Sequence, residues 1–231
     1  IETADPSAAL DITSTTGGLL VPRMTAAERD AITATQGLII FCTDCAFGEG
    51  ELQVKLTSNW KSLHDGGDVN DPVTLAIGDT HQGGIIFYLD GNGGGLIAAP
   101  SDQSSAAFWG CSEQFIGGTS SAVGTGAANT TAIVSGCSQT VIAAKICANY
   151  TDGTYTDWFL PSKDELNLMY DNIGQGNALG LGNVGNFSNS YYWSSTESGS
   201  SVAWDQNFSS GFQSGIANKN LTDSVRAVRA F

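Results

Sequence analysis

The stretch WFLPSKDELNLMY, residues 158–170, predicts a short amphipathic helix that packs on a protein core. Ser162 precedes Glu165 by three residues, the spacing of a capping box, in which each side chain accepts a hydrogen bond from the other's backbone N–H. Apolar residues then recur at helical spacing, at Leu166, Met169, Tyr170 and Ile173. The letters KDEL inside the stretch are not a retention address, because that signal is read at a free C-terminus. We therefore interpret residues 163–173 as a structural helix without a catalytic role.

Composition and charge limit the class of protein. The chain has 231 residues, of which 29 are glycine and only 14% are charged, which predicts many short strands and turns and few long helices. No apolar run approaches the ~20 residues needed to cross a bilayer, so we expect no membrane insertion. The net charge of −14 repels phosphate backbones and anionic lipids, which argues against nucleic acid as a partner.

The sequence predicts two folded units. HDGGDVNDPV, residues 64–73, combines Gly, Asp, Asn and Pro without apolar periodicity, as linkers do. We predict four parts: an extended arm at 1–22, a small α/β stalk or assembly unit at 23–64, a linker at 65–77 and a larger domain at 78–231.

Each unit has its own pattern of elements. In the small unit, Thr25 and Glu28 form a second capping box that opens a helix, and strands are predicted at 37–41, 51–56 and 59–63. In the larger domain the predicted elements are a hairpin at 83–100, helices at 126–135, 140–150 and 163–173, and strands at 191–195, 202–208 and 224–231. We expect the loop at 174–190 to fold back on the surface.

The five cysteines favour disulfides over metal or redox chemistry. Cys42 and Cys45 form a CxxC, but no second CxxC or His pair follows at zinc spacing, and the motif follows a strand instead of opening a helix. They form either a small disulfide-closed loop or two free thiols. The predicted helix at 140–150 would separate Cys137 from Cys147 by about 15 Å, too far for a bridge. We predict a disulfide between Cys111 and Cys137, with Cys147 as a buried thiol.

Two resemblances cover most of the chain. The ordered segments DWFLPSKDEL, YYWSSTE, AWDQNF and VRAVRAF, within about residues 83–231, resemble the C-terminal domain family of the Legionella collagen-like adhesin, a C-type-lectin-like group. The hairpin GGIIFYLDGNGGGLIAAP resembles the variant common in secreted proteins of Bacteroidetes. This resemblance implies an α+β, C-type-lectin-like domain with irregular loops, whose first and last strands pair and whose loops carry ligand contacts. Residues 7–63 resemble a stalk or assembly unit of bacterial surface and phage-like fibre proteins.

The sequence argues against an enzyme. Formylglycine-generating enzymes share the C-type-lectin-like scaffold, but they need a reactive cysteine pair in the C-terminal region, and this chain has no cysteine after Cys147. His64 and His81 lie in or near the linker, away from the serine-rich C-terminal motifs, so a Ser/His/Asp triad is not expected.

Binding is the remaining class of function. The candidate ligand-binding residues are Glu197, Asp205, Asn207, Lys219 and Tyr192. Alternation places Trp204 with Val202 and Gln206 on one face of a strand, so we assign Trp193 and Trp204 to the core. Arg226 and Arg229 are predicted to be structural partners of acidic residues. The oxygen clusters that could hold calcium lack complete ligand spacing, and we expect no cofactor and no required metal; they are Asp65, Asp68, Asn70 and Asp71, and the pair Asp205 and Asn207.

We therefore predict an exported, extracellular or cell-surface adhesin or fibre module that binds neutral glycans or a protein surface. The alternative is a structural subunit of a surface filament, with the C-terminal domain as decoration. The arm carries Leu10, Ile12, Leu19, Leu20 and Val21 without helical period or hairpin partner. Another copy of the chain is the partner that we expect to cover them; the alternatives are that the arm folds back or stays disordered.

Overall fold

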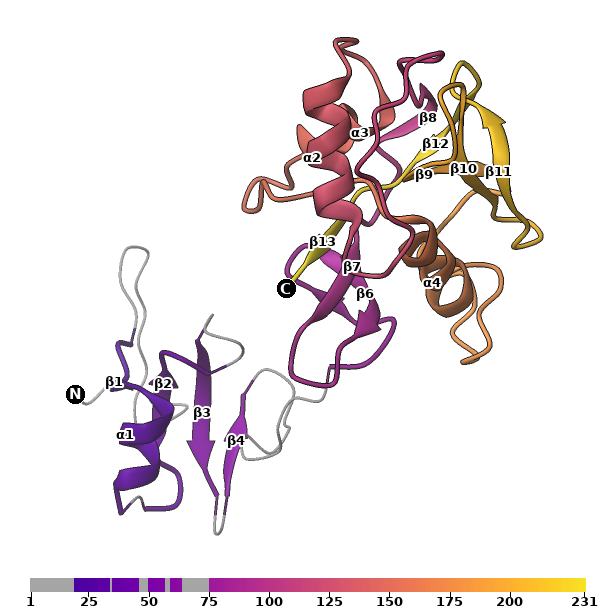
Figure 1. The fold of residues 1–231 in the computed structure, drawn as a ribbon. Helices are drawn as coiled ribbons and strands as arrows, with labels where there is room; N and C mark the ends of the chain where they lie inside the picture. Colours follow the sequence, from indigo (N-terminus) through magenta and orange to yellow (C-terminus); the bar gives the residue numbers. More distant parts are fainter. Residues whose placement is uncertain (1–18, 34, 46–49, 57–58, 64–74) are drawn as a thin grey trace, which may run out of the picture. The chain divides into compact units, whose positions relative to one another are not determined.

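The structure is a computed structural model that describes residues 19–33, 35–45, 50–56, 59–63 and 75–231. The chain divides into two compact units, residues 1–74 and 75–231 (Figure 1). The arm up to residue 18, His64 and most of the predicted linker, including its four oxygen-bearing residues, lie outside the described residues. None of the described helices is long and apolar enough to cross a membrane.

The N-terminal unit is a four-stranded sheet with one helix. The strands follow the order β1 (Arg23–Met24), β2 (Ile39–Cys42), β3 (Glu51–Lys55) and β4 (Trp60–Ser62). The helix α1 (Ala26–Ala31) opens with the predicted capping box, in which Thr25 N donates to Glu28 Oε2 at 2.8 Å and Glu28 N donates to Thr25 Oγ1 at 3.2 Å. The small core of this unit gathers around Ile40, Cys42 and Trp60.

The C-terminal unit contains two sheets. One has the order β13-β7-β6-β5 and the other the order β11-β10-β9-β12-β8. The strands of the first are β5 (Thr80–His81), β6 (Gly84–Leu89), β7 (Gly95–Ala98) and β13 (Val228–Ala230). The strands of the second are β8 (Ser104–Phe108), β9 (Tyr191–Glu197), β10 (Val202–Asn207), β11 (Gln213–Asn218) and β12 (Thr222–Val225). With its helices, this unit has the α+β architecture that the sequence predicts.

The end of the chain corrects two expectations. The predicted single strand at 224–231 is two strands, β12 and β13, in different sheets. Arg226 lies at the break, where its guanidinium pairs with Asp102 and donates to Ala99 O and Gly185 O. This buried cation draws its partners from two separate segments, residues 99–102 and the loop at Gly185. The last strand pairs with β7, in the register Val228↔Ala98, and not with the first strand of the unit.

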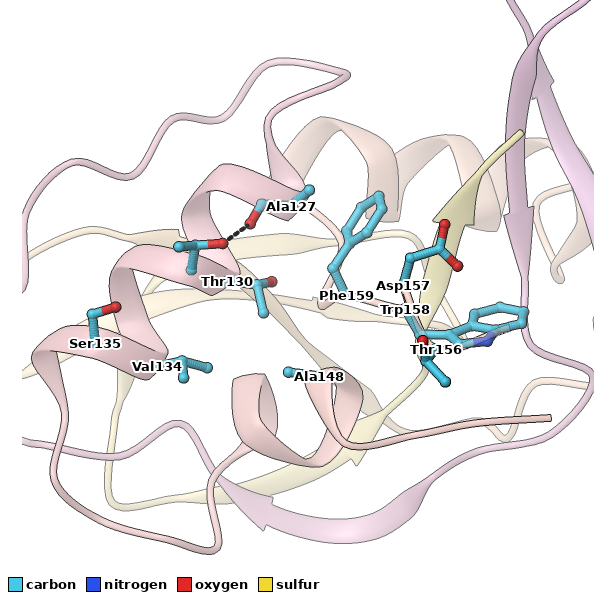
Figure 2. Close-up of a pocket in the computed structure, with 10 residues that line it drawn as sticks. Ala127, Thr130, Val134, Ser135, Ala148, Thr156, Asp157, Trp158 and Phe159 are labelled. Carbon is cyan, nitrogen blue, oxygen red and sulfur yellow. Dashed lines mark hydrogen bonds between the residues drawn. The ribbon is translucent and has the colours of Figure 1, made fainter. Parts of the chain in front are cut away.

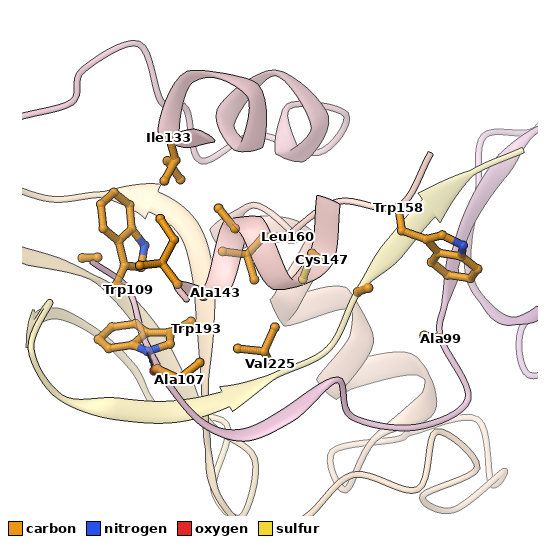
Figure 3. Close-up of a cluster of buried hydrophobic side chains, with 14 of the residues drawn as sticks. Ala99, Ala107, Trp109, Ile133, Ala143, Cys147, Trp158, Leu160, Trp193 and Val225 are labelled. Carbon is orange, nitrogen blue, oxygen red and sulfur yellow. Dashed lines mark hydrogen bonds between the residues drawn. The ribbon is translucent and has the colours of Figure 1, made fainter. Parts of the chain in front are cut away.

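Three helices cover the sheets: α2 (Gly126–Gly136), α3 (Ala143–Ala148) and α4 (Lys163–Ile173). Helix α3 packs on β8 and β12, α2 on β9, and α4 on β6, β9 and β10. The larger core contains Trp109 and Trp193, which Figure 3 shows between Ile133 and Ala107. Trp193 is fully buried, as predicted. The second core joins α4 to β6 and to Phe187 from the loop at 174–190, which does fold back on the domain.

Two disulfides are present. Cys111 and Cys137 join the segment after β8 to the end of α2, and Cys42 and Cys45 close a short loop after β2. Cys147 is a buried free thiol, and burial raises its pKa far above the ordinary range. A neutral thiol in an apolar core is a poor nucleophile.

Candidate ligand-binding site

Glu197 and Lys219, both predicted as ligand contacts, form a buried ion pair in the structure. Their side chains are 1% and 0% exposed. The Glu197 carboxylate also accepts from Ile116 N at 2.9 Å and Gly117 N at 2.8 Å. Lys219 Nζ donates to Gln114 O and lies 4.5 Å from the centroid of the Trp109 ring. The pair fastens the loop after β8 to the sheet and offers no exposed polar group to a ligand.

Tyr192 is also internal. Its hydroxyl donates to Asp102 Oδ2 at 2.8 Å and accepts from Ser188 N at 2.9 Å, and its ring packs on Phe187 and Phe208. Burial, with the nearby Asp102 carboxylate, raises the pKa of Tyr192 to about 12. The polar atom of this predicted ligand contact is therefore already paired inside the protein.

Asn207 and Trp204 lie at the edge of the packed region. The Asn207 side-chain oxygen accepts from Ser209 N at 2.8 Å, which holds the turn between β10 and β11. Trp204 is half-buried, and Lys163 Nζ lies 4.9 Å from its ring centroid. The assignment of Trp204 to the core is therefore wrong. The predicted alternation is present, but Ala203 faces the larger core, while the Trp204 ring lies against Gly215 of β11 and below Lys163 at the start of α4.

The buried Asp205 and the half-buried Asp223 form an acidic pair beside Trp193. Asp205 lies opposite Trp193 in the pairing of β10 with β9, and Asp223 lies on β12, the other neighbour of β9. Asp205 Oδ1 and Asp223 Oδ2 are both buried without a hydrogen-bond partner. Burial, together with the Asp223 charge, raises the pKa of Asp205 to about 7, and burial raises the pKa of Asp223 to about 6. The pair therefore retains a proton close to neutral pH.

Metal-ligating side chains come together at one point of the N-terminal unit. Within the described ranges, the one cluster of three metal-ligating side chains is Cys42, Asp44 and Cys45. Both of its sulfur atoms are in a disulfide, which removes the thiolates that a metal would need. Calcium takes six to eight oxygen ligands, of which Asp205 and Asp223 would supply only part. That no metal is required stays a prediction.

A groove on the C-terminal unit is the open site that the sequence did not reveal. It has a volume of 330 Å³ and lies between α2 and α3 on one side and the segment 156–159 on the other (Figure 2). Its lining combines small apolar, hydroxyl, acidic and aromatic side chains: Ala127, Thr130, Thr131, Val134, Ser135, Ala148, Thr156, Asp157, Trp158 and Phe159. These residues come from three segments that only the tertiary fold brings together.

Several polar groups of the groove remain available to a ligand. Thr131 and Thr130 use their hydroxyls on the backbone, at Ala127 O and Leu160 O, so they serve the helix and its packing. Asp157 is exposed and pairs with Arg229, which leaves carboxylate lone pairs open. Trp158 Nε1 is buried without a hydrogen-bond partner and is therefore not open to a ligand. Ser135 and Thr156 are exposed hydroxyls at the rim.

A second hollow of 260 Å³ is a weaker candidate. It lies at the turn of the β6–β7 hairpin and includes Tyr88 and Asp90. Asp90 Oδ1 already accepts from Asn92 N at 2.7 Å and Gly94 N at 3.0 Å, so its carboxylate stabilises its own turn. The groove beside α2 therefore has the richer set of open polar groups.

Comparison with known families agrees with both resemblances. Residues 101–229 match the Lcl C-terminal domain, and residues 1–76 match the phage tail like trimerisation region. No curated protein sequence matches the chain.

Proposed function

The chain belongs to the Lcl C-terminal domain family, and we propose that it is an exported, noncatalytic adhesin or fibre module that assembles as a trimer and binds a ligand with residues 75–231. The observation that carries this proposal is the combination, in one chain, of a trimerisation region at 1–76 with an Lcl C-terminal domain at 101–229. A trimer presents three copies of a weak binding site. Its overall affinity for a surface exceeds the affinity of one site, because each further contact of a bound trimer is intramolecular. The two disulfides favour an oxidising, extracellular location.

Three features support a noncatalytic role. Cys147 is buried, with a raised pKa, and so is not an accessible nucleophile. His81 packs edge-on against Phe231 at 4.6 Å between ring centroids, in a structural environment. The acidic pair Asp205 and Asp223 lies beside Trp193 and outside the groove.

The proposed ligand is a neutral glycan, with a protein surface as the other class. Exposed hydroxyls at Ser135 and Thr156 and the carboxylate of Asp157 suit sugar hydroxyl groups, which both donate and accept hydrogen bonds. The net charge of −14 repels sulfated polyanions at long range. The proposed site is therefore the groove between α2 and the segment 156–159.

A glycan array with the full-length protein tests this function. Ala127 and Ala128 are neighbouring, exposed residues of α2, but only Ala127 lines the groove. Ala127→Trp should fill the groove and reduce glycan binding at least tenfold, whereas the matched variant Ala128→Trp should bind as the wild type does. Because multivalent display on an array raises the apparent affinity, affinities should also be measured with monovalent glycans in solution.

Two outcomes would contradict the proposal. Binding to no sugar and to no protein would favour the alternative of a filament subunit whose C-terminal domain is decoration. Tight binding to heparin at physiological salt would contradict the choice of a neutral ligand. It would show that the net negative charge of the chain does not exclude sulfated polyanions.

A further inference from the structure

The sheet of the N-terminal unit has two unequal faces. Ile40 pairs with Gln53 and Gln53 with Ser62, which places the three side chains on one face, and all three are buried. Helix α1 covers this face: the buried Arg29 Nη1 donates to Gln53 Oε1 at 2.9 Å. This side of the sheet is therefore complete within one copy of the chain.

The opposite face, here called the open face, is apolar and exposed. Leu52 lies between Phe41 on β2 and Leu63, which follows β4 and donates from its N–H to Leu52 O at 2.9 Å. Ile39 and Val54 form the next cross-strand pair. Ile39, Leu52 and Leu63 are 38%, 43% and 51% exposed.

The distribution of charge on the open face resembles that of a protein interface. The register places Arg23 beside Phe41 and Lys61 beside Val54, on β1 and β4, the two edge strands. The Arg23 guanidinium lies 4.7 Å from the centroid of the Phe41 ring. An apolar centre with charged residues at the margin is the usual anatomy of a contact surface.

We propose that the open face is the surface through which three copies of this chain pack against one another. The inference rests on the proposed trimer, because the matched trimerisation region, residues 1–76, contains the whole sheet. A sheet needs an apolar partner on a face that carries several large aliphatic side chains. In a threefold arrangement, the same face of each copy turns toward the symmetry axis, and Leu52, at the centre of its row, lies nearest to the neighbouring copies.

Light scattering coupled to size exclusion tests this inference on the full chain. The wild type should have a mass close to three times the 23.9 kDa of one chain. Leu52→Glu should reduce the mass to that of a single chain, because three carboxylates would be brought together in an apolar contact. Ile216→Glu is the matched control: Ile216 is an aliphatic strand residue in the C-terminal unit, 84% exposed, and its replacement should leave the trimer unchanged.

A second variant separates dissociation from unfolding. Leu52→Thr/Leu63→Thr removes aliphatic surface but keeps residues that favour strands, and it should weaken the trimer at least tenfold. Trp60, which is 3% exposed in the covered core, reports by its fluorescence whether the sheet remains folded. A trimeric wild type whose mass is unaffected by either variant would overturn the open-face inference and leave the proposed function intact. A wild type that is monomeric across the micromolar range would instead overturn the trimer itself.

Discussion

Asp205 and Asp223 lie on the two strands that flank β9, and each has a buried carboxylate oxygen without a hydrogen-bond partner. The pKa of Asp205 is raised from 3.8 to about 7, by burial and by the charge of Asp223. The folded state therefore binds more protons than the unfolded state between about pH 4 and pH 7. By linkage, this contribution to stability is complete below pH 4 and is lost as the pH rises through 7.

The first prediction is that Asp205→Asn removes this pH dependence in part. At pH 8 the variant should be more stable than the wild type by on the order of 2 kcal/mol, because an amide needs no proton to be neutral. At pH 5 the advantage of the variant should be less than half as large, because the folded wild type still holds its proton there. Urea unfolding at both pH values, followed by near-ultraviolet circular dichroism, measures the difference.

Asp164→Asn is the control for this comparison. Asp164 is exposed and pairs with Lys163 at 3.3 Å, so its replacement should change stability by a similar amount at both pH values. An Asp205→Asn effect that is equal at pH 5 and pH 8 would show that the acidic pair does not retain its proton in the folded protein.

The second prediction concerns metal. Unfolding curves of the full chain with a chelator and with millimolar calcium should superimpose, because we expect no metal to bind. A metal that bound only the folded state would raise the midpoint of unfolding. The oxygen clusters of the sequence lack complete calcium spacing, and the sulfur atoms of the cluster at Cys42 and Cys45 are joined in a disulfide. A calcium-dependent rise that Asp205→Asn abolishes would identify the acidic pair as a cation site.

The third prediction is that Lys219→Met destabilises the C-terminal unit by about 3–5 kcal/mol, since it leaves the Glu197 charge buried and unpaired. The double variant Glu197→Gln/Lys219→Met should recover part of this loss, because no charge then remains to be desolvated. Urea unfolding of the four proteins of this cycle measures the coupling. A cost below 1 kcal/mol for Lys219→Met would mean that the carboxylate reaches solvent.

Local sequence patterns predicted the helices and strands better than they predicted the long-range contacts between them. The capping boxes at Ser162 and Thr25 follow from residue spacing within one turn of helix, and both are present. The break at Arg226 could not be read in the same way: the adjacent apolar residues Ala227 and Val228 interrupt the alternation in SVRAVRAF, but the interruption does not say that the chain passes to another sheet. The break depends on Asp102, more than a hundred residues earlier in the chain, which only the tertiary fold brings near.

The candidate site shows the same limit. Glu197 and Lys219 are polar residues in the serine-rich C-terminal region, a composition typical of an exposed loop, but each is the buried partner of the other. The groove residues Ala127, Ser135 and Thr156 have no distinguishing sequence pattern. They become neighbours because α2 packs across from the segment before Trp158.

The last prediction concerns Glu165, whose role exceeds its predicted place in a capping box. Its carboxylate accepts from Ser162 N at 2.7 Å and also from Gly124 N at 2.8 Å and Gly126 N at 3.3 Å, so it joins the start of α4 to the start of α2. An added Cβ at Gly126 would overlap this carboxylate, which explains glycine there. Glu165→Ala should therefore cost about 3 kcal/mol, because buried N–H groups lose their acceptor.

Ser162→Ala is the comparison that tests this account, since it removes the cap hydrogen bond from Glu165 N and the hydrogen bond that Ser162 Oγ donates to Ala122 O, and it should cost about 1–2 kcal/mol, less than Glu165→Ala. Glu28→Ala changes the equivalent residue of the exposed capping box of α1, and its effect should stay small and confined to the N-terminal unit. Urea unfolding measures the stabilities, and amide exchange at Gly124 and Gly126 locates the change. Equal losses for Glu165→Ala and Ser162→Ala, with exchange at the two glycines unaltered, would reduce Glu165 to an ordinary helix cap.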